Sequence, residues 1–411
     1  MTRGGFVGGA LASLLLQLSV SHNLAGAQSN EPVPPRTTAS PGRPGTQVDA
    51  SAGESELAWP LAPGAGTGSM SVRGSVRAIG RVDAEQLNAL TFSWSYSGFV
   101  VRFRGTGLKV RLQNQLGYHY VAVLDGNIRF RFQSFPGIAS YELVRGVAEG
   151  EHQLELHRET EGQYGASTLL GFAGATILAP PAEPSRRIEI IGDSTSAGYG
   201  NMGSEHHRPE LHDGCGFSFA TESAYDTYGA RAARALGSDL SIVAVSGWGV
   251  LRGNDHTPEK NVPRVYPRAV ADWSRPLWSF KTQPQVVVIN LGANDLRPPA
   301  PSDPGEGLFR RRYLALVRTV REKYPMAWIF CSLGPTMSDD WPTDIAARTL
   351  LQTRLQSIVA DRVRIGDNHV SYLEFPRHDT ALSGCDWHPS AREHEKMGHQ
   401  LERAIRDKLG W

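Results

Sequence analysis

Four short apolar runs in the C-terminal half of the chain constrain its fold most strongly. They lie at residues 188–191, 241–245, 286–291 and 327–331. Such runs are typical of strands that are buried on both faces of a parallel sheet. Helical patterns lie between or after them, at 224–236, about 307–323 and about 345–361. A last helix is expected to start near Pro389, with the proline in its first turn.

This alternation predicts an α/β fold, a three-layer doubly wound parallel sheet over residues 185–411. Ligands of such sheets bind outside the carboxyl ends of the strands. Reactive side chains are therefore expected in the turns that follow the apolar runs.

The preceding region, residues 71–182, has a different pattern. Short segments that favour strands lie at 92–96, 100–104, 108–112, 120–124 and 128–132. The last two flank Asp125-Gly126-Asn127, which is a hairpin signal. The region shows no long helical period, so it predicts a small all-β domain, a sandwich or jelly roll. Prolines between 180 and 184 mark the boundary with the α/β domain.

The N-terminus has the pattern of a secretory signal peptide over residues 1–27. Arg3 supplies a positive charge, residues 6–20 are mostly apolar, and Ala25-Gly26-Ala27 fits a cleavage site. The alternative is an uncleaved anchor, although the apolar core is short for a spanning helix of about 20 residues. Residues 28–70 are rich in proline, glycine, serine and alanine, which predicts a disordered linker. We expect a secreted, periplasmic or extracellular monomer that has no membrane attachment after signal cleavage.

Charge and cysteine content narrow the possible partners. The formal net charge of +1 argues against a nucleic-acid partner and against electrostatic attachment to a membrane. Cys331 lies in an apolar run and is expected to be a buried thiol. Cys215 and Cys385 both lie close in sequence to candidate site residues. In an exported protein we expect these two to form a disulfide.

The triplet Gly192-Asp193-Ser194 directly follows the first apolar run. A serine hydroxyl in such a turn becomes a nucleophile when a base takes its proton. The alternatives are an ordinary turn and a phosphate-binding loop, but no Gly-Lys-Ser/Thr follows. The Gly-x-Ser-x-Gly elbow of α/β-hydrolases does not occur in the chain. A serine hydrolase of this sequence must therefore use another architecture.

His388 is the candidate base for Ser194. Asp386, two residues earlier, is a candidate to orient the imidazole, although it could instead cap the last helix. Gly247 follows the second apolar run and Asn294 follows the third, where a backbone N–H and a side-chain amide could stabilise an oxyanion. Each block alone is compatible with an ordinary turn, but their joint order is much more specific.

These blocks carry a family resemblance. Gly192-Asp193-Ser194, Gly247, Gly292-Ala293-Asn294-Asp295 and His388-Pro389 resemble the four blocks of the SGNH (GDSL-type) hydrolases over about 185–411. Residues 192–201 and Asp386-Trp387-His388-Pro389-Ser390, behind a β-sandwich, are similar to carbohydrate esterase family 2. Members of that family join a jelly-roll domain to an SGNH domain and remove acetyl groups from plant polysaccharides such as xylan and glucomannan.

The resemblance implies a role for each site residue. Ser194 is the nucleophile, His388 is the base, and the oxyanion hole consists of the Ser194 and Gly247 N–H groups and the Asn294 side chain. The wider superfamily has an aspartate three residues before the histidine, where this chain has Cys385. The tighter spacing of Asp386 resembles the esterase family, in which a backbone carbonyl can orient the histidine instead.

Other residues are candidates for substrate contacts. Trp387 could stack on a sugar ring, or it could pack under the last helix. Trp248 is a weaker candidate of the same kind, and Asp295 is expected to contact the substrate. The expected ligand is an acetylated polysaccharide or oligosaccharide.

The sequence gives little support for a metal site. His394 and His399 are five residues apart, which does not place them on one helical face. His206-His207, near Asp213 and Cys215, lacks ligand spacing. We therefore predict a mechanism without a metal or other cofactor.

Two other functions remain compatible with the sequence. One is a lipase, thioesterase or acetyltransferase on the same scaffold, although the loop at 254–273 is more polar than a lipase lid. The other is a non-catalytic carbohydrate-binding surface protein.

Overall fold

The computed structural model describes residues 71–203, 215–379 and 383–411. The expected signal peptide and linker, and His206, His207 and Asp213, lie outside the described residues. No helix within the described ranges is long and apolar enough to cross a membrane.

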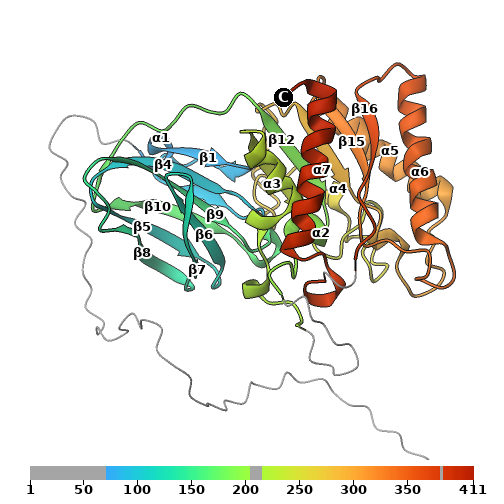
Figure 1. Cartoon of the computed structure of the whole chain (residues 1–411), viewed down its shortest axis with the longest axis horizontal. Coiled ribbons are helices and arrows are strands. Elements are labelled where there is room, and N and C mark those ends of the chain that lie inside the picture. Colours follow the sequence, from blue (N-terminus) through green and yellow to red (C-terminus); the bar gives the residue numbers. More distant parts are fainter. Residues whose placement is uncertain (1–70, 204–214, 380–382) are drawn as a thin grey trace, which may run out of the picture. The chain divides into compact units, whose positions relative to one another are not determined.

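The first described domain consists of two packed antiparallel sheets (Figure 1). One sheet has the strand order β1-β4-β9-β6-β7, with β11 paired to β4, and the other has the order β2-β3-β10-β5-β8. The elements are α1 (Val72–Ser75), β1 (Val76–Ile79), β2 (Val82–Asp83), β3 (Leu90–Phe92), β4 (Gly98–Arg104), β5 (Gly107–Asn114), β6 (His119–Leu124), β7 (Asn127–Gln133), β8 (Gly137–Arg145), β9 (Glu151–Arg158), η1 (Gly162–Tyr164), β10 (Ser167–Ala173) and β11 (Thr176–Ile177). The prediction of an N-terminal all-β domain is confirmed.

The expected hairpin at 120–132 is formed by β6 and β7. Asp125 and Gly126, at its turn, have φ angles of 49° and 80°, which suit a tight turn between twisted strands. The expected strand at 92–96 is wrong beyond Phe92, where β3 ends. Trp94 and Tyr96 lie in a buried turn and join the hydrophobic clusters of the second domain. Their large side chains are needed at the domain interface, which the local alternation could not reveal.

The second domain is built on a parallel sheet of strand order β13-β12-β14-β15-β16. Its elements are β12 (Arg187–Gly192), α2 (Ser194–Ala197), η3 (Phe219–Thr221), η4 (Ala224–Asp226), α3 (Tyr228–Ala235), β13 (Asp239–Ala244), α4 (Val262–Val265), β14 (Val286–Asn290), η5 (Asn294–Leu296), α5 (Glu306–Lys323), β15 (Trp328–Leu333), α6 (Ala347–Arg364), β16 (Val370–Glu374), η7 (Cys385–Trp387) and α7 (Ala391–Leu409). The prediction of a parallel-sheet α/β domain is confirmed.

The sequence expectations differ from this domain in two details. The edge strand β16 was not expected, because only two of its five residues are buried and it lacks an apolar run. The last helix begins at Ala391, with Ser390 at its N-cap, so the expectation of Pro389 in its first turn is wrong.

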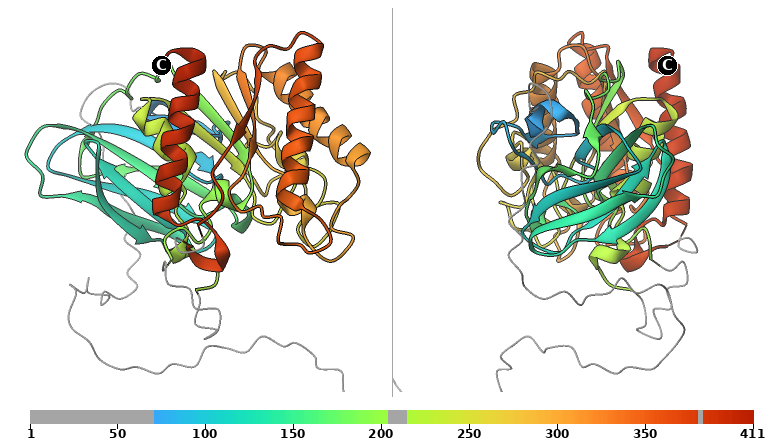
Figure 2. Two further views of the ribbon diagram at one scale, coloured as in Figure 1. Left: turned by 45° about the vertical axis from the view of Figure 1, so that its right-hand side comes forward. Right: turned by 90° about the vertical axis from the view of Figure 1, so that its left-hand side faces the viewer.

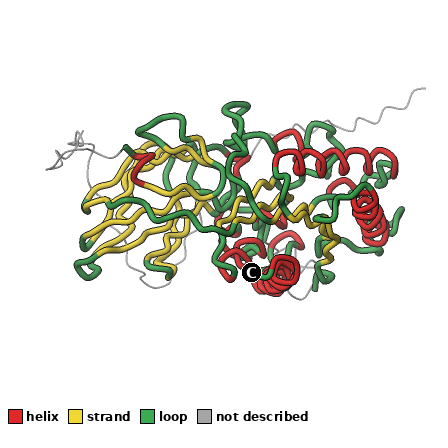
Figure 3. Tube along the Cα trace, turned by 90° about the horizontal axis from the view of Figure 1, so that it is seen from above, coloured by secondary structure: helices red, strands yellow, loops and turns green. Residues whose placement is uncertain are grey.

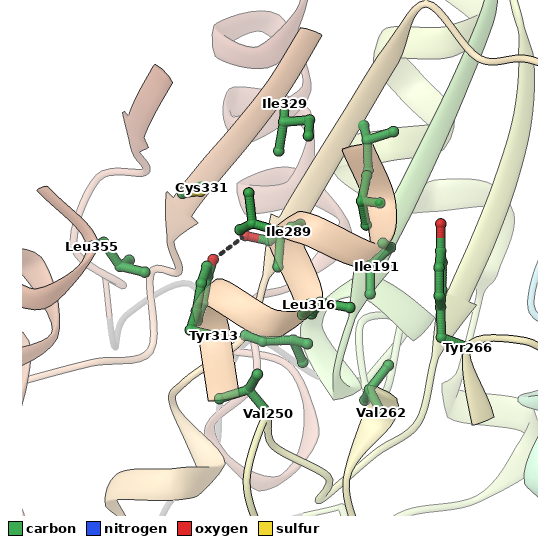
Figure 4. Packing of buried hydrophobic residues seen from close by; sticks show 14 of the residues in the cluster. Ile191, Val250, Val262, Tyr266, Ile289, Tyr313, Leu316, Ile329, Cys331 and Leu355 are labelled. Carbon is green, nitrogen blue, oxygen red and sulfur yellow. Dashed lines mark hydrogen bonds between the residues drawn. The ribbon is translucent and has the colours of Figure 1, made fainter. Parts of the chain in front are cut away.

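Alternate residues of the central strands face opposite layers of helices. Ile190 of β12 packs in a cluster with α3 and α7, whereas Ile191 packs in a cluster with α5 and α6. Figures 2 and 3 show α7 on one face of the sheet and α5 and α6 on the other. In the second cluster Tyr313 of α5 lies against β14, and its hydroxyl donates to the Ile289 carbonyl at 3.2 Å (Figure 4).

A buried ion pair joins the two domains. Arg81, between β1 and β2, donates from Nη2 to both carboxylate oxygens of Glu189 on β12, at 3.1 and 3.0 Å. The hydroxyls of Tyr266 and Tyr324 also donate to Glu189, at 2.9 and 3.2 Å. A buried charge pair is tolerated when its remaining hydrogen-bonding capacity is used, so this network fixes the β domain against the first strand of the parallel sheet.

Candidate active site

Ser194 lies at the carboxyl end of β12, where the chain turns into α2. Asp193 is the N-cap of this short helix, and its Oδ1 accepts from the Thr195 N–H at 3.2 Å. Gly198 ends the helix in the left-handed region, where a Cβ would lie 2.3 Å from the Ser223 carbonyl oxygen. Ser194 is partly exposed, whereas Asp193 and Thr195 are buried. The turn therefore presents the Ser194 hydroxyl at the edge of the sheet.

His388 lies next to this hydroxyl. Its Nε2 is 2.8 Å from Ser194 Oγ, and its Nδ1 is 3.0 Å from the backbone carbonyl oxygen of Asp386. With the proton on Nδ1 donated to that carbonyl, Nε2 is free to accept the serine proton. The two residues thus have the geometry of a nucleophile and its general base.

The expected roles of the Asp386 side chain need correction. Its carboxylate does not contact His388 but accepts from the Tyr199 hydroxyl at 2.7 Å. It does not cap the last helix either, because that position belongs to Ser390. Asp386 and Trp387 have φ angles of 50° and 62°, and this left-handed turn directs the Asp386 carbonyl, rather than the carboxylate, toward His388.

The loop that carries His388 is held at several points. The Gly384 N–H donates to the His388 carbonyl at 2.7 Å, and the His388 N–H donates to the Cys385 carbonyl at 3.1 Å. The Cys385 N–H donates to the carbonyl of Gly200, which follows α2, at 2.9 Å. Cys385 also forms a disulfide with Cys215. The base is therefore tied directly to the segment that follows the nucleophile.

An aromatic wall lies beside the base. The ring centroid of Tyr199 is 4.4 Å from that of His388, and the Phe217 ring stacks on Tyr199 at 4.9 Å. Tyr164 of the β domain stacks on Phe217 at 5.3 Å. Sequence reasoning missed Phe217 and Tyr164, because nothing in their local pattern indicates that they extend the aromatic wall beside His388.

Burial and one nearby cation set the ionisation of the site. Burial, and then the positive charge of Arg297, lower the pKa of His388 to about 4. Burial raises the pKa of Asp193 to about 7, against the opposing influence of the Thr195 N–H and of Arg297. His388 is therefore neutral, and able to accept a proton, at any pH well above 4.

Gly247 and Asn294 reach the same edge from β13 and β14. Gly247 has a φ of 77°, its carbonyl accepts from the Asn254 N–H at 2.8 Å, and its own N–H donates no hydrogen bond within the described residues. Asn294 donates from Nδ2 to the Trp248 carbonyl at 3.1 Å and to Asp193 Oδ2 at 3.4 Å. The longer of these bonds is weak, so that N–H can turn toward an oxyanion.

The β domain contributes a buried carboxylate to this edge. One oxygen of Glu161 accepts from the Ser246 N–H at 2.7 Å, and the other accepts from the Ser246 hydroxyl. The Glu161 N–H donates to Glu222 Oε2 at 3.1 Å, and burial raises the pKa of both carboxyl groups. Because Glu161 precedes the site by more than thirty residues and lies in another domain, no local motif could have identified it.

The expected substrate contact of Asp295 is wrong. Asp295 is fully buried, and its carboxylate accepts from the N–H groups of Val250, Leu251 and Arg252 at 2.9, 2.7 and 3.1 Å. It therefore shapes the loop after Gly247 from beneath and cannot reach a substrate.

The two tryptophan candidates differ in exposure. Trp387, next to His388, is 49% exposed. Trp248 is partly buried and packs against the hydrophobic cluster between the sheet and helices α5 and α6. Trp387 thus has the more accessible ring.

Within the described ranges, no group of histidine, cysteine or carboxylate side chains is arranged to hold a metal ion. His394 is buried in α7, where its Nδ1 accepts from the Tyr228 N–H at 3.1 Å. It packs against Tyr228 between α3 and α7 and makes no hydrogen bond to Ser194 or His388.

Comparison with family models matches both domains. The model described as "Carbohydrate esterase 2 N-terminal" matches residues 78–181, and the "GDSL-like Lipase/Acylhydrolase family" model matches residues 190–396. Among curated proteins, "Cellulase/esterase CelE" of Acetivibrio thermocellus is 34% identical over 336 residues, which cover 81% of this chain but only 39% of that protein. An "Acetylxylan esterase / glucomannan deacetylase" of Cellvibrio japonicus is 27% identical, over 80% of this chain and 88% of that protein.

Solved structures give the same result. A family two carbohydrate esterase from Clostridium thermocellum, in complex with cellohexaose, is 35% identical with a TM-score of 0.74, over 82% of this chain and 99% of that chain. A carbohydrate esterase family 2 enzyme from Corynascus thermopiles is 30% identical with a TM-score of 0.72, over 82% of this chain and all of that chain.

Proposed function

The chain belongs to carbohydrate esterase family 2, and on that premise we propose that it is a serine esterase that removes O-acetyl groups from plant-type polysaccharides such as xylan and glucomannan. The observation that carries the proposal is the contact of 2.8 Å between Ser194 Oγ and His388 Nε2, with Nδ1 held by a backbone carbonyl. A serine and a neutral imidazole in this geometry can carry out acyl transfer.

The first half of the reaction acylates the serine. Ser194 Oγ attacks the acetyl carbonyl carbon while His388 Nε2 takes the hydroxyl proton. The N–H groups of Ser194 and Gly247 and the Asn294 amide stabilise the negative charge of the tetrahedral intermediate. The bond to the sugar oxygen then breaks, His388 returns its proton to that oxygen, and an acetyl-Ser194 ester remains.

The second half releases acetate. His388 takes a proton from water, and the resulting hydroxide attacks the acetyl carbonyl through a second tetrahedral intermediate. Cleavage of the bond to Ser194 Oγ returns the proton from His388 to the serine and frees acetic acid, which ionises at neutral pH. The carbonyl of Asp386 keeps the imidazole in one tautomer throughout.

The surroundings of the dyad suit a sugar substrate. Trp387 exposes 49% of its surface beside His388, and a flat indole can stack against the C–H face of a pyranose ring. Export through the signal peptide at 1–27 is part of the proposal, and the Cys215–Cys385 disulfide supports it because such bonds persist in oxidising compartments.

The test is acetate release from a panel of acetylated polysaccharides, with Ser194→Ala as the control variant. We expect release from acetylated xylan or glucomannan, and a loss of at least about 10⁴ in kcat for Ser194→Ala with an unchanged fold by circular dichroism. Faster hydrolysis of long-chain than of acetyl esters would instead assign the chain to the lipases. Glycan binding without any acetate release would assign it a non-catalytic role.

A further inference from the structure

Arg297 is a cation near the dyad, and its guanidinium makes no hydrogen bond to the residues that the structure describes. It follows η5 directly and so lies three residues after Asn294. Its backbone is anchored, since His256 Nε2 lies 2.6 Å from the Arg297 carbonyl oxygen. Within the described residues its guanidinium donates no hydrogen bond and joins no ion pair, although it lies over an aromatic ring and feels the charge of Asp193. Its N–H donors are therefore available to an acidic ligand, to which a guanidinium can bind with two parallel hydrogen bonds.

Among the described residues, a neighbouring arginine, Arg252, uses its guanidinium for hydrogen bonds within the protein, unlike Arg297. Arg252 lies at the same edge of the sheet, and it donates to the carbonyl of Asp295 at 3.1 and 2.9 Å and to that of Ser302 at 2.8 Å. Its donors are therefore used to hold the loops together. Arg297 has no such structural task among the described residues.

Trp341 is the ring that Arg297 contacts. The guanidinium carbon lies 4.7 Å from the centre of its ring, which is a cation–π distance, and Trp341 remains 48% exposed. Trp341 lies between β15 and α6, and Arg297 follows β14. Strand β14 pairs on one side with β15 and on the other with β12, the strand that leads to Ser194. The two side chains therefore form a partly exposed platform on the β15 side of Ser194.

The charge of Arg297 acts on the catalytic residues. It is the second cause, after burial, of the lowered pKa of His388, and it opposes the raised pKa of Asp193. The positive charge of Arg297 makes His388 a weaker base, which works against proton transfer from Ser194. An anionic group bound at Arg297 would reduce this penalty, and since the acetyl ester is uncharged in the ground state, a second group on the substrate could supply that anion.

We propose that Arg297 and Trp341 form a subsite for a uronic acid residue. This residue belongs to the same glycan as the acetyl group that is removed at Ser194. The guanidinium would pair with the sugar carboxylate through two N–H donors, and the indole would contact the C–H face of the ring. The preferred substrates are then acidic acetylated glycans rather than neutral ones. This inference rests on the proposed function, since the acetyl group is removed at Ser194.

The test compares two acetylated xylo-oligosaccharides of equal length and acetylation, one of which carries a single glucuronic acid branch. The readout is the ratio of kcat/KM for the acidic substrate to that for the neutral one, measured at low salt with the full chain. We expect a ratio of about ten for the native enzyme, which corresponds to one charge-assisted contact of about 1.4 kcal/mol. Arg297→Gln should bring the ratio close to one, and Arg297→Lys should retain part of it.

Arg318→Gln is the matched control, because Arg318 is an exposed arginine of α5 that makes no ion pair or hydrogen bond with other described residues. It removes the same charge from the protein and should leave the ratio at its native value. A second measurement is independent of turnover: in the Ser194→Ala background, calorimetry should show tighter binding of the acidic oligosaccharide, and Arg297→Gln should abolish the difference. Trp341→Ala should weaken the binding of the acidic oligosaccharide more than that of the neutral one.

The outcomes separate this inference from the function on which it rests. Equal native rates on the two oligosaccharides, or a native preference that survives Arg297→Gln, would overturn the uronic acid subsite alone. Product inhibition by free acetate that disappears in Arg297→Gln, without any preference for the acidic glycan, would assign the guanidinium to the product and also overturn it. Hydrolysis of a small acetyl ester with no release from either glycan would refute the proposed function itself.

Discussion

Glu161 of the β domain holds Ser246, the residue that precedes Gly247 in the α/β domain. Its carboxylate accepts from the Ser246 N–H at 2.7 Å and also from the Ser246 hydroxyl. Ser246 lies where β13 leads into the turn that presents the Gly247 N–H. The β domain is therefore part of the catalytic unit, because it fixes a turn from which an oxyanion donor is expected.

Substitution of Glu161 tests this coupling. Glu161→Gln keeps the size of the side chain, but an amide has one acceptor oxygen where the carboxylate has two. One of the two hydrogen bonds to Ser246 should therefore be lost, and the Ser246 turn should loosen. We expect kcat on a small acetyl ester to fall about tenfold with KM changed less than twofold, because an oxyanion donor acts mainly in the transition state. Unfolding free energy should fall by about 1–3 kcal/mol, the cost of an unsatisfied buried polar group.

Ser246→Ala is the companion variant, since it removes the hydroxyl bond and keeps the N–H bond. Its effect on kcat should be smaller than that of Glu161→Gln. A rise in KM with unchanged kcat in Glu161→Gln would contradict the positioning role and leave only a structural one.

Replacement of Asp386 by asparagine should have little effect on catalysis. The orienting group is the backbone carbonyl, which the substitution retains, and asparagine tolerates the φ of 50° at this position. We expect kcat to stay within about threefold of the native value, whereas loss of a true triad aspartate costs about 10⁴. A loss of that larger size, measured on a small acetyl ester, would show that the carboxylate orients His388 after all.

Reduction of the Cys215–Cys385 disulfide should lower both stability and activity. The bond joins residues 170 positions apart and ties the His388 loop to the segment that bears Phe217. Loss of a native disulfide typically costs about 2–5 kcal/mol, and a looser loop should also reduce kcat. Urea unfolding and esterase assays with and without a mild reductant measure the two effects.

The third cysteine does not complicate this experiment. Cys331 is buried, and burial raises the pKa of its thiol to about 12, so it remains protonated and unreactive. The double variant Cys215→Ala/Cys385→Ala should reproduce the effect of the reductant. Full activity and native stability in that variant would show that the remaining loop contacts suffice.

Activity should be lost on the acid side only at an unusually low pH. Arg297 and Asp386 act on His388 electrostatically, Tyr199 packs against its ring, and His394 of α7 lies within electrostatic range. Burial together with Arg297 lowers the pKa of His388 to about 4. The imidazole must be neutral to accept the serine proton, so activity should fall only as pH drops through about 4. With the ordinary pKa of about 6.5, roughly nine-tenths of the activity would already be lost at pH 5.5.

The assay is kcat/KM on a small acetyl ester from pH 3.5 to 8. Asp193, with a pKa of about 7, ionises at higher pH and leaves the acid limb to His388. Arg297→Gln should move the limb to higher pH, since it removes a charge that disfavours the imidazolium. A native limb centred above pH 6 would be inconsistent with a buried His388.

The sequence by itself determined the features that depend on local periodicity and short spacing. The apolar runs predicted four strands of the parallel sheet, and the turn after the first run placed Ser194 at a strand end. The short spacing between Asp386 and His388 left either the Asp386 carboxylate or a backbone carbonyl as the orienting group. These predictions succeed because a buried strand and a tight turn each leave their pattern within a few residues.

Only the tertiary structure decided which atoms contact one another in the site. Whether the carbonyl or the carboxylate of Asp386 meets His388 depends on two left-handed backbone angles that the residue types do not specify. The contacts of Glu161 with Ser246 and of Arg297 with Trp341 join segments 85 and 44 positions apart, respectively. Such pairs are formed by strand order and domain packing, so the local pattern of either partner carries no information about the other.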